Sequence, residues 1–291
     1  MGPGIQTKPS GSLLLAWQVK DKHCLVIGGG DVALSRIHHL IRAQAKITVI
    51  GGTSEKGINA EILQLNKEGY IYKLVERDYE SSDLTMYEKT KLDLGGEDCY
   101  VYDLISSDHY EEIDRQVKNE VFANVCCCID DYKLSTKIYY QCKFLRLPVN
   151  IADKPPLCDF YFGSMFNQDN LQIMISTNGK SPRLLKLIKD NIAKQFEGID
   201  LNKAVENLGL IRSRLRETIV LDDDLVSIDT RMAWIKKLTD FFTLKQWSNL
   251  DLISGDQDRF ERVDRIIKYF PEYPPREFDN FKLAIYNQCL E

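Results

Sequence analysis

Hydrophobic and polar positions alternate in blocks along the first half of the chain. Short apolar runs, typical of buried strands, recur between stretches whose apolar residues have helical spacing. The runs that we interpret as strands are Cys24–Ile27, Ile47–Ile50, Tyr70–Val75, Phe122–Ile129 and Pro148–Ala152. Because these strands alternate with helices, the pattern predicts an α/β fold with a Rossmann-like parallel sheet, whose ligands bind at the carboxyl ends of the strands.

The pattern changes after residue 152. Two apolar runs, Asp159–Phe166 and Leu171–Thr177, have the spacing of a hairpin, and Ser181-Pro182 is typical of a helix start. Beyond Gly198 the apolar residues follow helical periods, with a helix predicted to begin at Asp229. We expect a flexible tail over 1–12, the Rossmann-like domain over 13–152, a small α+β domain over 153–198 and a helical C-terminal domain over 199–291. The prolines at 271, 274 and 275 are expected to end regular structure.

The first strand runs into the sequence GGGDVA over residues 28–33. A strand, a G-x-G-x-x-A turn and a helix form the first half of a dinucleotide-binding unit. In that unit Gly28 permits the tight turn, Gly30 lets the backbone approach a pyrophosphate, and the helix N-terminus attracts the phosphates. The second strand ends in Gly51-Gly52-Thr53 without an acidic residue to bind the ribose. The sequence therefore leaves the choice between NAD and NADP open.

A second candidate feature is Asp153, which ends the last predicted strand and is followed by Lys154, Pro155 and Pro156. An acid held at a strand end by two prolines is well placed to face a cleft. Ile129, at the end of the neighbouring strand, falls at the same edge of the sheet. A carboxylate there can act as a general base, but it can also cap a turn or pair with Lys154.

Composition narrows the function classes. The net charge is −5 and no long basic block is present, which argues against nucleic-acid binding. No apolar run is long enough to span a bilayer, so we expect no membrane association. The eight cysteines form no CxxC pair and fit small buried residues of a reducing, cytoplasmic protein better than a metal cluster. The acidic stretch over 80–97 is expected to be an exposed insertion, and Arg183, Lys186 and Lys189 are either a solvated face or clamps for substrate carboxylates.

Several motifs together carry a family resemblance. GGGDVA (28–33), the pair Asp130-Asp131, VNIADKPPLCDF (149–160) and ISTNGKSP (175–182) resemble the siroheme synthase family, and in particular its fungal bifunctional members. The resemblance covers roughly residues 13–220. A chance match to the three longer motifs in this order is improbable.

The resemblance implies a function. It implies NAD-dependent oxidation of precorrin-2, an octacarboxylate tetrapyrrole, to sirohydrochlorin, followed by insertion of ferrous iron as a substrate to give siroheme. It implies Asp153 as the catalytic residue, acting as the general base in both steps. The cofactor-binding residues then become Gly28, Gly29, Gly30, Asp31, Val32, Gly52, Thr53 and Ile129. It also implies a homodimer built through the α+β domain. The sequence itself shows no dedicated metal ligands.

Two alternatives remain at this level. One is a precorrin-2 dehydrogenase that lacks chelatase activity, and the other is a sensor that binds NAD(H) without turnover. The acid at 153 favours an enzyme over a sensor, whereas the sequence does not separate one activity from two.

Overall fold

The structure, a computed structural model, describes residues 12–52, 57–89, 105–168, 171–177, 180–219, 225–252 and 260–286. The chain divides between Phe162 and Gly163 into one unit over 14–162 and another over 163–291, to which residues 1–13 are assigned. Our division into domains at residues 152 and 198 stays a prediction.

A five-stranded parallel sheet forms the centre of the first unit. Its strands are β1 (His23–Ile27), β2 (Lys46–Ile50), β3 (Lys73–Val75), β4 (Phe122–Cys127) and β5 (Val149–Ile151). They lie in the order β3-β2-β1-β4-β5, which confirms the predicted Rossmann-like fold. The chain order reverses between β1 and β4, so the carboxyl ends of these two strands flank the position where such sheets bind ligands.

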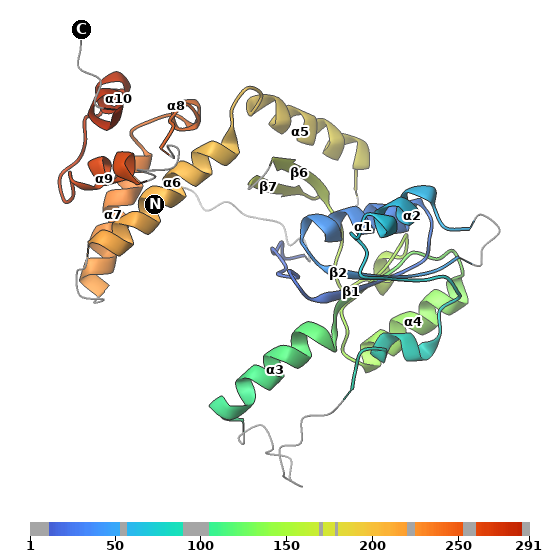
Figure 1. Ribbon diagram of the computed structural model, residues 1–291. Helices are drawn as coiled ribbons and strands as arrows, with labels where there is room; N and C mark the ends of the chain where they lie inside the picture. The colour runs from blue at the N-terminus through green and yellow to red at the C-terminus, as the bar shows by residue number, and fades with distance from the viewer. Residues whose placement is uncertain are drawn as a thin grey trace, which may run out of the picture. The chain divides into compact units, whose positions relative to one another are not determined.

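Helices cover both faces of this sheet, because successive residues of a strand point to opposite sides. Val26 and Cys126 pack beneath α1 (Asp31–Arg42) and α2 (Ala60–Lys67), whereas Ile27 and Cys127 pack against α4 (Tyr132–Phe144) on the other face (Figure 1). Adjacent cysteines of β4 therefore enter different cores. Their burial confirms that they are small apolar residues of the sheet.

The stretch after β3 contradicts one expectation. The region that we predicted to be an exposed insertion begins with a 3₁₀ turn, η1 (Ser81–Thr85), in which Asp83 and Leu84 are both only 2% exposed. Tyr87 then packs against His23 and Phe122. The stretch is mostly polar, but its few apolar side chains complete the core, Leu84 beside α4 and Tyr87 beside the first residues of β1 and β4. Residues 90–104, which include the rest of the predicted insertion, lie outside the described residues.

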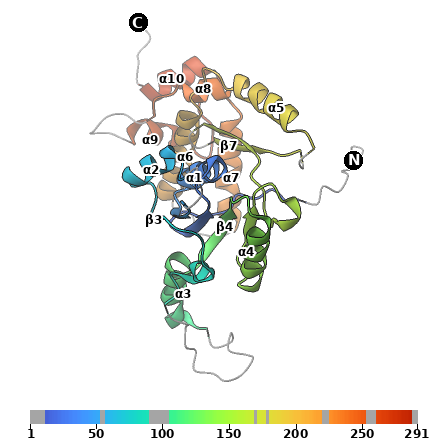
Figure 2. The same cartoon turned by 90° about the vertical axis from the view of Figure 1, so that its right-hand side faces the viewer.

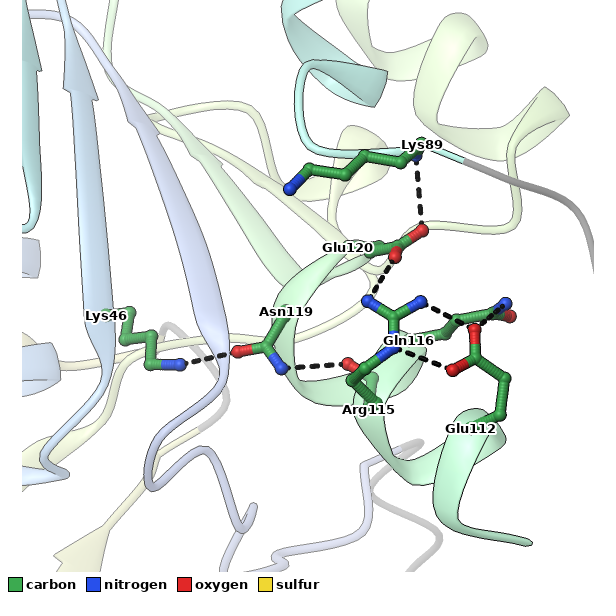
Figure 3. A network of polar contacts seen from close by, with 7 residues as sticks. All are labelled: Lys46, Lys89, Glu112, Arg115, Gln116, Asn119 and Glu120. Carbon is green, nitrogen blue, oxygen red and sulfur yellow. Dashed lines mark hydrogen bonds and ion pairs between the residues drawn. The ribbon is translucent and has the colours of Figure 1, made fainter. Parts of the chain in front are cut away.

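Helix α3 (Ser107–Asn119) has no buried residue of its own and is tied to the sheet by polar contacts (Figure 3). Lys46 of β2 donates to Asn119 at 2.8 Å. The buried carboxylate of Glu120 lies 2.8 Å from the Arg115 guanidinium and accepts a hydrogen bond from the backbone of Lys89. Because a buried carboxylate without a cation is costly, Arg115 stabilises the junction between α3 and β4.

The second unit begins with an antiparallel hairpin of β6 (Ser164–Gln168) and β7 (Leu171–Ile175), followed by α5 (Pro182–Gln195). The hairpin lies beside α5 (Figures 1 and 2). The predicted strand from Asp159 is thus shorter, because residues 159–162 belong to the first unit. Ser181 is the N-cap position of α5, as predicted, but its side chain makes no capping hydrogen bond.

A helical bundle with its own core completes this unit. Its helices are α6 (Leu201–Thr218), α7 (Leu225–Thr239), α8 (Leu244–Ser248), α9 (Glu261–Ile267) and α10 (Phe278–Tyr286). Trp234, Trp247 and Phe281 are almost fully buried at its centre. The predicted start at Asp229 is wrong because α7 begins at Leu225, and α10 after the prolines contradicts the expected end of regular structure. No helix in the described ranges is both long and apolar enough to cross a membrane.

The buried imidazole of His23 generates a stability prediction. It is 2% exposed, and burial, with a smaller contribution from the charge of Lys46, lowers its pKa from 6.5 to about 4. The unfolded chain therefore binds a proton at a higher pH than the folded chain does. We expect the free energy of unfolding to fall by up to about 3 kcal/mol as the pH drops from 6.5 to 4.

Urea unfolding of the wild type and His23→Leu at pH 7, 5.5 and 4.5 measures this effect. The substitution should remove that part of the pH dependence, whatever it does to stability at pH 7. Parallel curves for the two proteins would contradict the prediction.

Candidate functional site

The carboxyl ends of β1 and β4 meet at Gly28. Its φ is 121°, in a region that side chains rarely adopt, and a Cβ there would lie 2.5 Å from the carbonyl oxygen of Cys128. The Gly28 amide donates to the carbonyl of Ile50 at 2.7 Å. Glycine is therefore required at this position for steric reasons, and it brings the ends of β1, β2 and β4 into backbone contact.

Gly30 faces open space at the N-terminus of α1. A Cβ added to it would meet no atom within 4 Å, and no side chain caps the helix. The first amides of α1 are therefore free to bind an anion, whose charge the helix dipole would also favour. Ala33, on the inner face of the same helix, is fully buried, and its small side chain allows α1 to pack closely on the sheet. These features fit the phosphates of a dinucleotide.

The next residues add a contact that the sequence did not predict. Asp31 accepts a hydrogen bond from the Asn59 side chain at 2.8 Å, and the Asn59 backbone donates to Gly29 at 2.8 Å. Ile58 lies against Gly29, with its Cγ1 at 3.2 Å from a built Cβ. The start of α2 thus braces the glycine turn, which only the tertiary structure could reveal. Val32 is 39% exposed.

The other expected cofactor residues lie in different surroundings. Gly51 and Gly52 follow β2, and the φ of Gly52 is 133°. The end of β2 thus offers no carboxylate at these two positions to bind the ribose of the cofactor. Thr53 lies outside the described residues. Ile129 is half-buried and packs into the core cluster covered by α4.

Asp153 follows β5 with φ of 58°, a left-handed conformation that aspartate and asparagine tolerate better than most side chains. The residue is exposed. Across the described parts of the chain, no group forms a hydrogen bond or ion pair with its carboxylate. A left-handed backbone conformation and an unpaired carboxylate at the end of a strand together make Asp153 a candidate functional residue.

The expected alternative, a pair with Lys154, is not formed. The Lys154 ammonium contacts the Ser135 hydroxyl and lies 4.7 Å from the centre of the Tyr132 ring. Both partners belong to α4, so the lysine is directed away from Asp153. Asp131, in contrast, caps α4 by accepting a hydrogen bond from the backbone amide of Leu134 at 2.9 Å.

The segment after Asp153 folds back along β5. Asn150 donates to the carbonyl of Phe160 at 2.9 Å, and the Cys158 thiol donates to the carbonyl of Ile151 at 3.2 Å. The Asp159 carboxylate accepts from the backbone of Val149 at 3.0 Å and from Lys143 at 2.6 Å. These contacts hold both ends of the loop that presents Asp153.

Cys128 lies between the glycine turn and the acid. Burial raises the pKa of its thiol to about 12, the charge of Arg36 lowers it, and the charges of Cys127 and Asp153 raise it further. The thiol is therefore protonated and is not a nucleophile at neutral pH. Among the described residues, no three histidines, cysteines or acids gather into a metal site.

Family models match three consecutive parts of the chain. A putative NAD(P)-binding family matches residues 15–164, the central part of sirohaem biosynthesis proteins matches 168–195, and their C-terminal part matches 199–255. A solved structure of SirC, a precorrin-2 dehydrogenase, has a TM-score of 0.53 at 17% identity, covers 89% of this chain and all of its own, and shares the fold.

Curated relatives extend over almost the whole chain. The siroheme biosynthesis protein of Saccharomyces cerevisiae is 35% identical over 274 residues, which cover 91% of this chain and 96% of that protein. The Schizosaccharomyces pombe protein of the same description is 31% identical and covers 92% and 83%. A siroheme synthase of Psychrobacter arcticus is 28% identical over 60% of this chain and 25% of its own length. The chain belongs to the siroheme biosynthesis protein family.

Proposed function

We propose that this protein oxidises precorrin-2 to sirohydrochlorin with NAD and then inserts ferrous iron to give siroheme. The observation that carries the proposal is the free carboxylate of Asp153 at the same edge of the sheet as the glycine turn. Family membership supports the substrate, because the fungal relatives are described as siroheme biosynthesis proteins.

The cofactor part of the proposal rests on the turn between β1 and α1. Gly28 and Gly29 form the tight turn, Gly30 leaves room for a pyrophosphate beside the backbone, and the amides of Asp31 and Val32 belong to the first turn of α1, which no side chain caps. Gly52 and Thr53 would border the ribose, and Ile129 would border the nicotinamide end of the site. When bound, NAD supplies the hydride acceptor.

Asp153 would act as the general base of the oxidation. Precorrin-2 loses a hydride and a proton, and the carboxylate takes the proton while the hydride leaves in the other direction. The left-handed backbone and the folded-back loop hold this carboxylate in place before substrate binds. Since Lys154 is engaged by α4, no neighbouring cation of the loop neutralises the base.

The same acid would serve iron insertion. Ferrous iron enters the macrocycle as two pyrrole N–H protons leave, and a carboxylate beside the ring can accept a proton or guide the cation. The described residues contain no cluster of metal ligands, so the tetrapyrrole nitrogens themselves would hold the iron. This arrangement needs one cleft and one acid for both steps.

Replacing Asp153 by Asn tests this role, because asparagine keeps the shape and tolerates the left-handed backbone. We expect both hydride transfer and iron insertion to fall by roughly 10²–10⁴-fold, with NADH affinity unchanged. The measurements are NADH formation from precorrin-2 and the spectral change of sirohydrochlorin on adding Fe²⁺.

Asp21→Asn is the matched control, because Asp21 is another exposed aspartate with φ near 60° and precedes β1 at the opposite edge of the sheet. It should keep both activities. Full activity of Asp153→Asn in both assays would refute the proposed base. Loss of hydride transfer alone would separate the two steps, and a wild type without iron insertion would be a dehydrogenase only.

The two ends of the glycine turn should respond differently to substitution. Gly28→Ala places a Cβ against the Cys128 carbonyl at a strained φ, so we expect a loss of stability of about 3 kcal/mol. Gly30→Asp fits sterically but brings a negative charge to the anion site, so NADH affinity should fall at least about tenfold with little change in Tm.

Thermal unfolding and NADH fluorescence titration measure both effects. Gly209→Asp is the control, because Gly209 is exposed and also has no atom within 4 Å of a built Cβ. If Gly30→Asp binds NADH as tightly as this control, the turn does not hold the pyrophosphate.

We also propose that the hairpin and α5 form a homodimer. No described residue of β6, β7 or α5 is buried, and α5 exposes Leu184, Leu187 and Ile188. A two-stranded sheet is marginal by itself, and its free edges suit pairing with a second copy. The described cysteines are free, which fits a reducing compartment such as the cytoplasm.

Leu187→Glu tests the dimer. Light scattering after gel filtration should give twice the 33.6 kDa chain mass for the wild type and the single mass for the variant. Leu244→Glu, which alters a leucine of similar exposure on α8, should stay dimeric. A wild type of 33.6 kDa at all concentrations would refute the proposal.

A further inference from the structure

Arg36 of α1 is a half-buried cation that has no anionic partner in the part of the chain that the structure describes. Its guanidinium carbon lies 4.3 Å from the centre of the Phe162 ring, and the His39 ring stacks on the same phenylalanine at 5.3 Å. In the described ranges, Arg36 makes no hydrogen bond or ion pair with another residue. Its Nε is buried and has no acceptor.

This state contrasts with other arginines that pack within the fold. Arg77 holds the Asp83 carboxylate through two hydrogen bonds of 2.9 and 2.6 Å, and Arg214 holds Asp264 through two of 2.8 and 3.1 Å. A cation–π contact with Phe162 stabilises the guanidinium plane but accepts none of its N–H groups. Leaving a buried donor unpaired is costly, so an acceptor from outside the chain is expected.

The guanidinium lies near the site that presents Asp153. Side chains of a helix lean toward its N-terminus, and the N-terminus of α1 lies at the carboxyl edge of the sheet, where the glycine turn is. The guanidinium packs on Phe162, which follows Phe160 by two residues. The Phe160 carbonyl accepts a hydrogen bond from Asn150 of β5, the strand that ends just before Asp153. Arg36 and Asp153 therefore belong to one neighbourhood.

The neighbours of Arg36 favour substrate over cofactor. Its charge also acts on the thiols of Cys126 in β4 and Cys158 after β5. The cofactor ribose of this fold is recognised at the end of β2, on the other side of β1. An anion bound by Arg36 would thus lie on the side of Asp153.

We propose that Arg36 is a substrate-binding residue whose guanidinium donates two hydrogen bonds to a carboxylate side chain of the tetrapyrrole. This inference rests on the proposed function, since it assigns one residue to the carboxylates of that substrate. A planar guanidinium matches a carboxylate in two-pronged geometry, and the net charge of −5 makes a local cation necessary for a polyanion. The Phe162 ring, on which His39 also stacks, holds the guanidinium in place before the ligand arrives.

The test is an equilibrium titration with sirohydrochlorin, followed by its absorbance, for wild type, Arg36→Gln, Arg36→Lys and the control Arg42→Gln. Arg42 is an exposed arginine on the same helix, so the control makes the same charge change. We expect Arg36→Gln to weaken sirohydrochlorin binding by roughly 10–100-fold, Arg36→Lys to recover part of the loss, and Arg42→Gln to bind like wild type. The NADH affinity should be unchanged, and the KM for precorrin-2 should rise more than kcat falls.

Several outcomes would overturn the inference. Equal sirohydrochlorin affinity for Arg36→Gln and wild type, or an equal loss in Arg42→Gln, would remove the specific role. A selective loss of NADH binding would assign Arg36 to the cofactor, and loss of both ligands with a lower Tm would make it structural. If Arg36→Gln does not fold, the sirohydrochlorin affinity of Arg36→Lys tests the inference instead. Wild-type affinity in that variant would exclude a two-pronged contact, because a lysine cannot make one. A wild type that binds no sirohydrochlorin would instead refute the proposed function itself.

Discussion

The close approach of two strand ends at Gly28 is the constraint on which the rest of the site depends. The Cys128 carbonyl occupies the space that any side chain at position 28 would need, and the Gly28 amide simultaneously pairs with β2. Three strand ends are thereby joined through backbone alone. Because the chain order reverses at this point, the first amides of α1 point toward the place where sheets of this kind bind their ligands.

The loop after β5 exposes the carboxylate of Asp153 without placing a lysine of the same loop against it. Two lysines close to this loop are engaged elsewhere: Lys154 contacts Ser135 and Tyr132, and Lys143 pairs with Asp159. The folded-back segment also carries Phe162 to Arg36. One continuous stretch of chain therefore determines both the free acid and the position of a free cation, and such a pair suits a ligand that carries exchangeable protons and carboxylates.

The two units differ in how much of their apolar surface is buried within the unit itself. The sheet of the first unit is covered on both faces, and the helical bundle of the second has a centre of buried aromatic residues. No described residue of the hairpin or of α5 is buried, which is the physical reason to expect a second copy there.

The sequence by itself determined the periodic elements and the glycine turn, because strand and helix periods and the steric demands of Gly28 are local properties. It also identified Asp153 through a strand end and two prolines. It misjudged residues 80–87 and the helix after Pro275, where a few apolar anchors in polar or proline-rich surroundings decide the structure. Only the tertiary structure decided that Lys154 contacts α4, that Asn59 braces Asp31, and that Arg36 has no anionic partner among the described residues. Each of these features depends on contacts between side chains from elements that are far apart in sequence, and no local sequence pattern predicts such contacts.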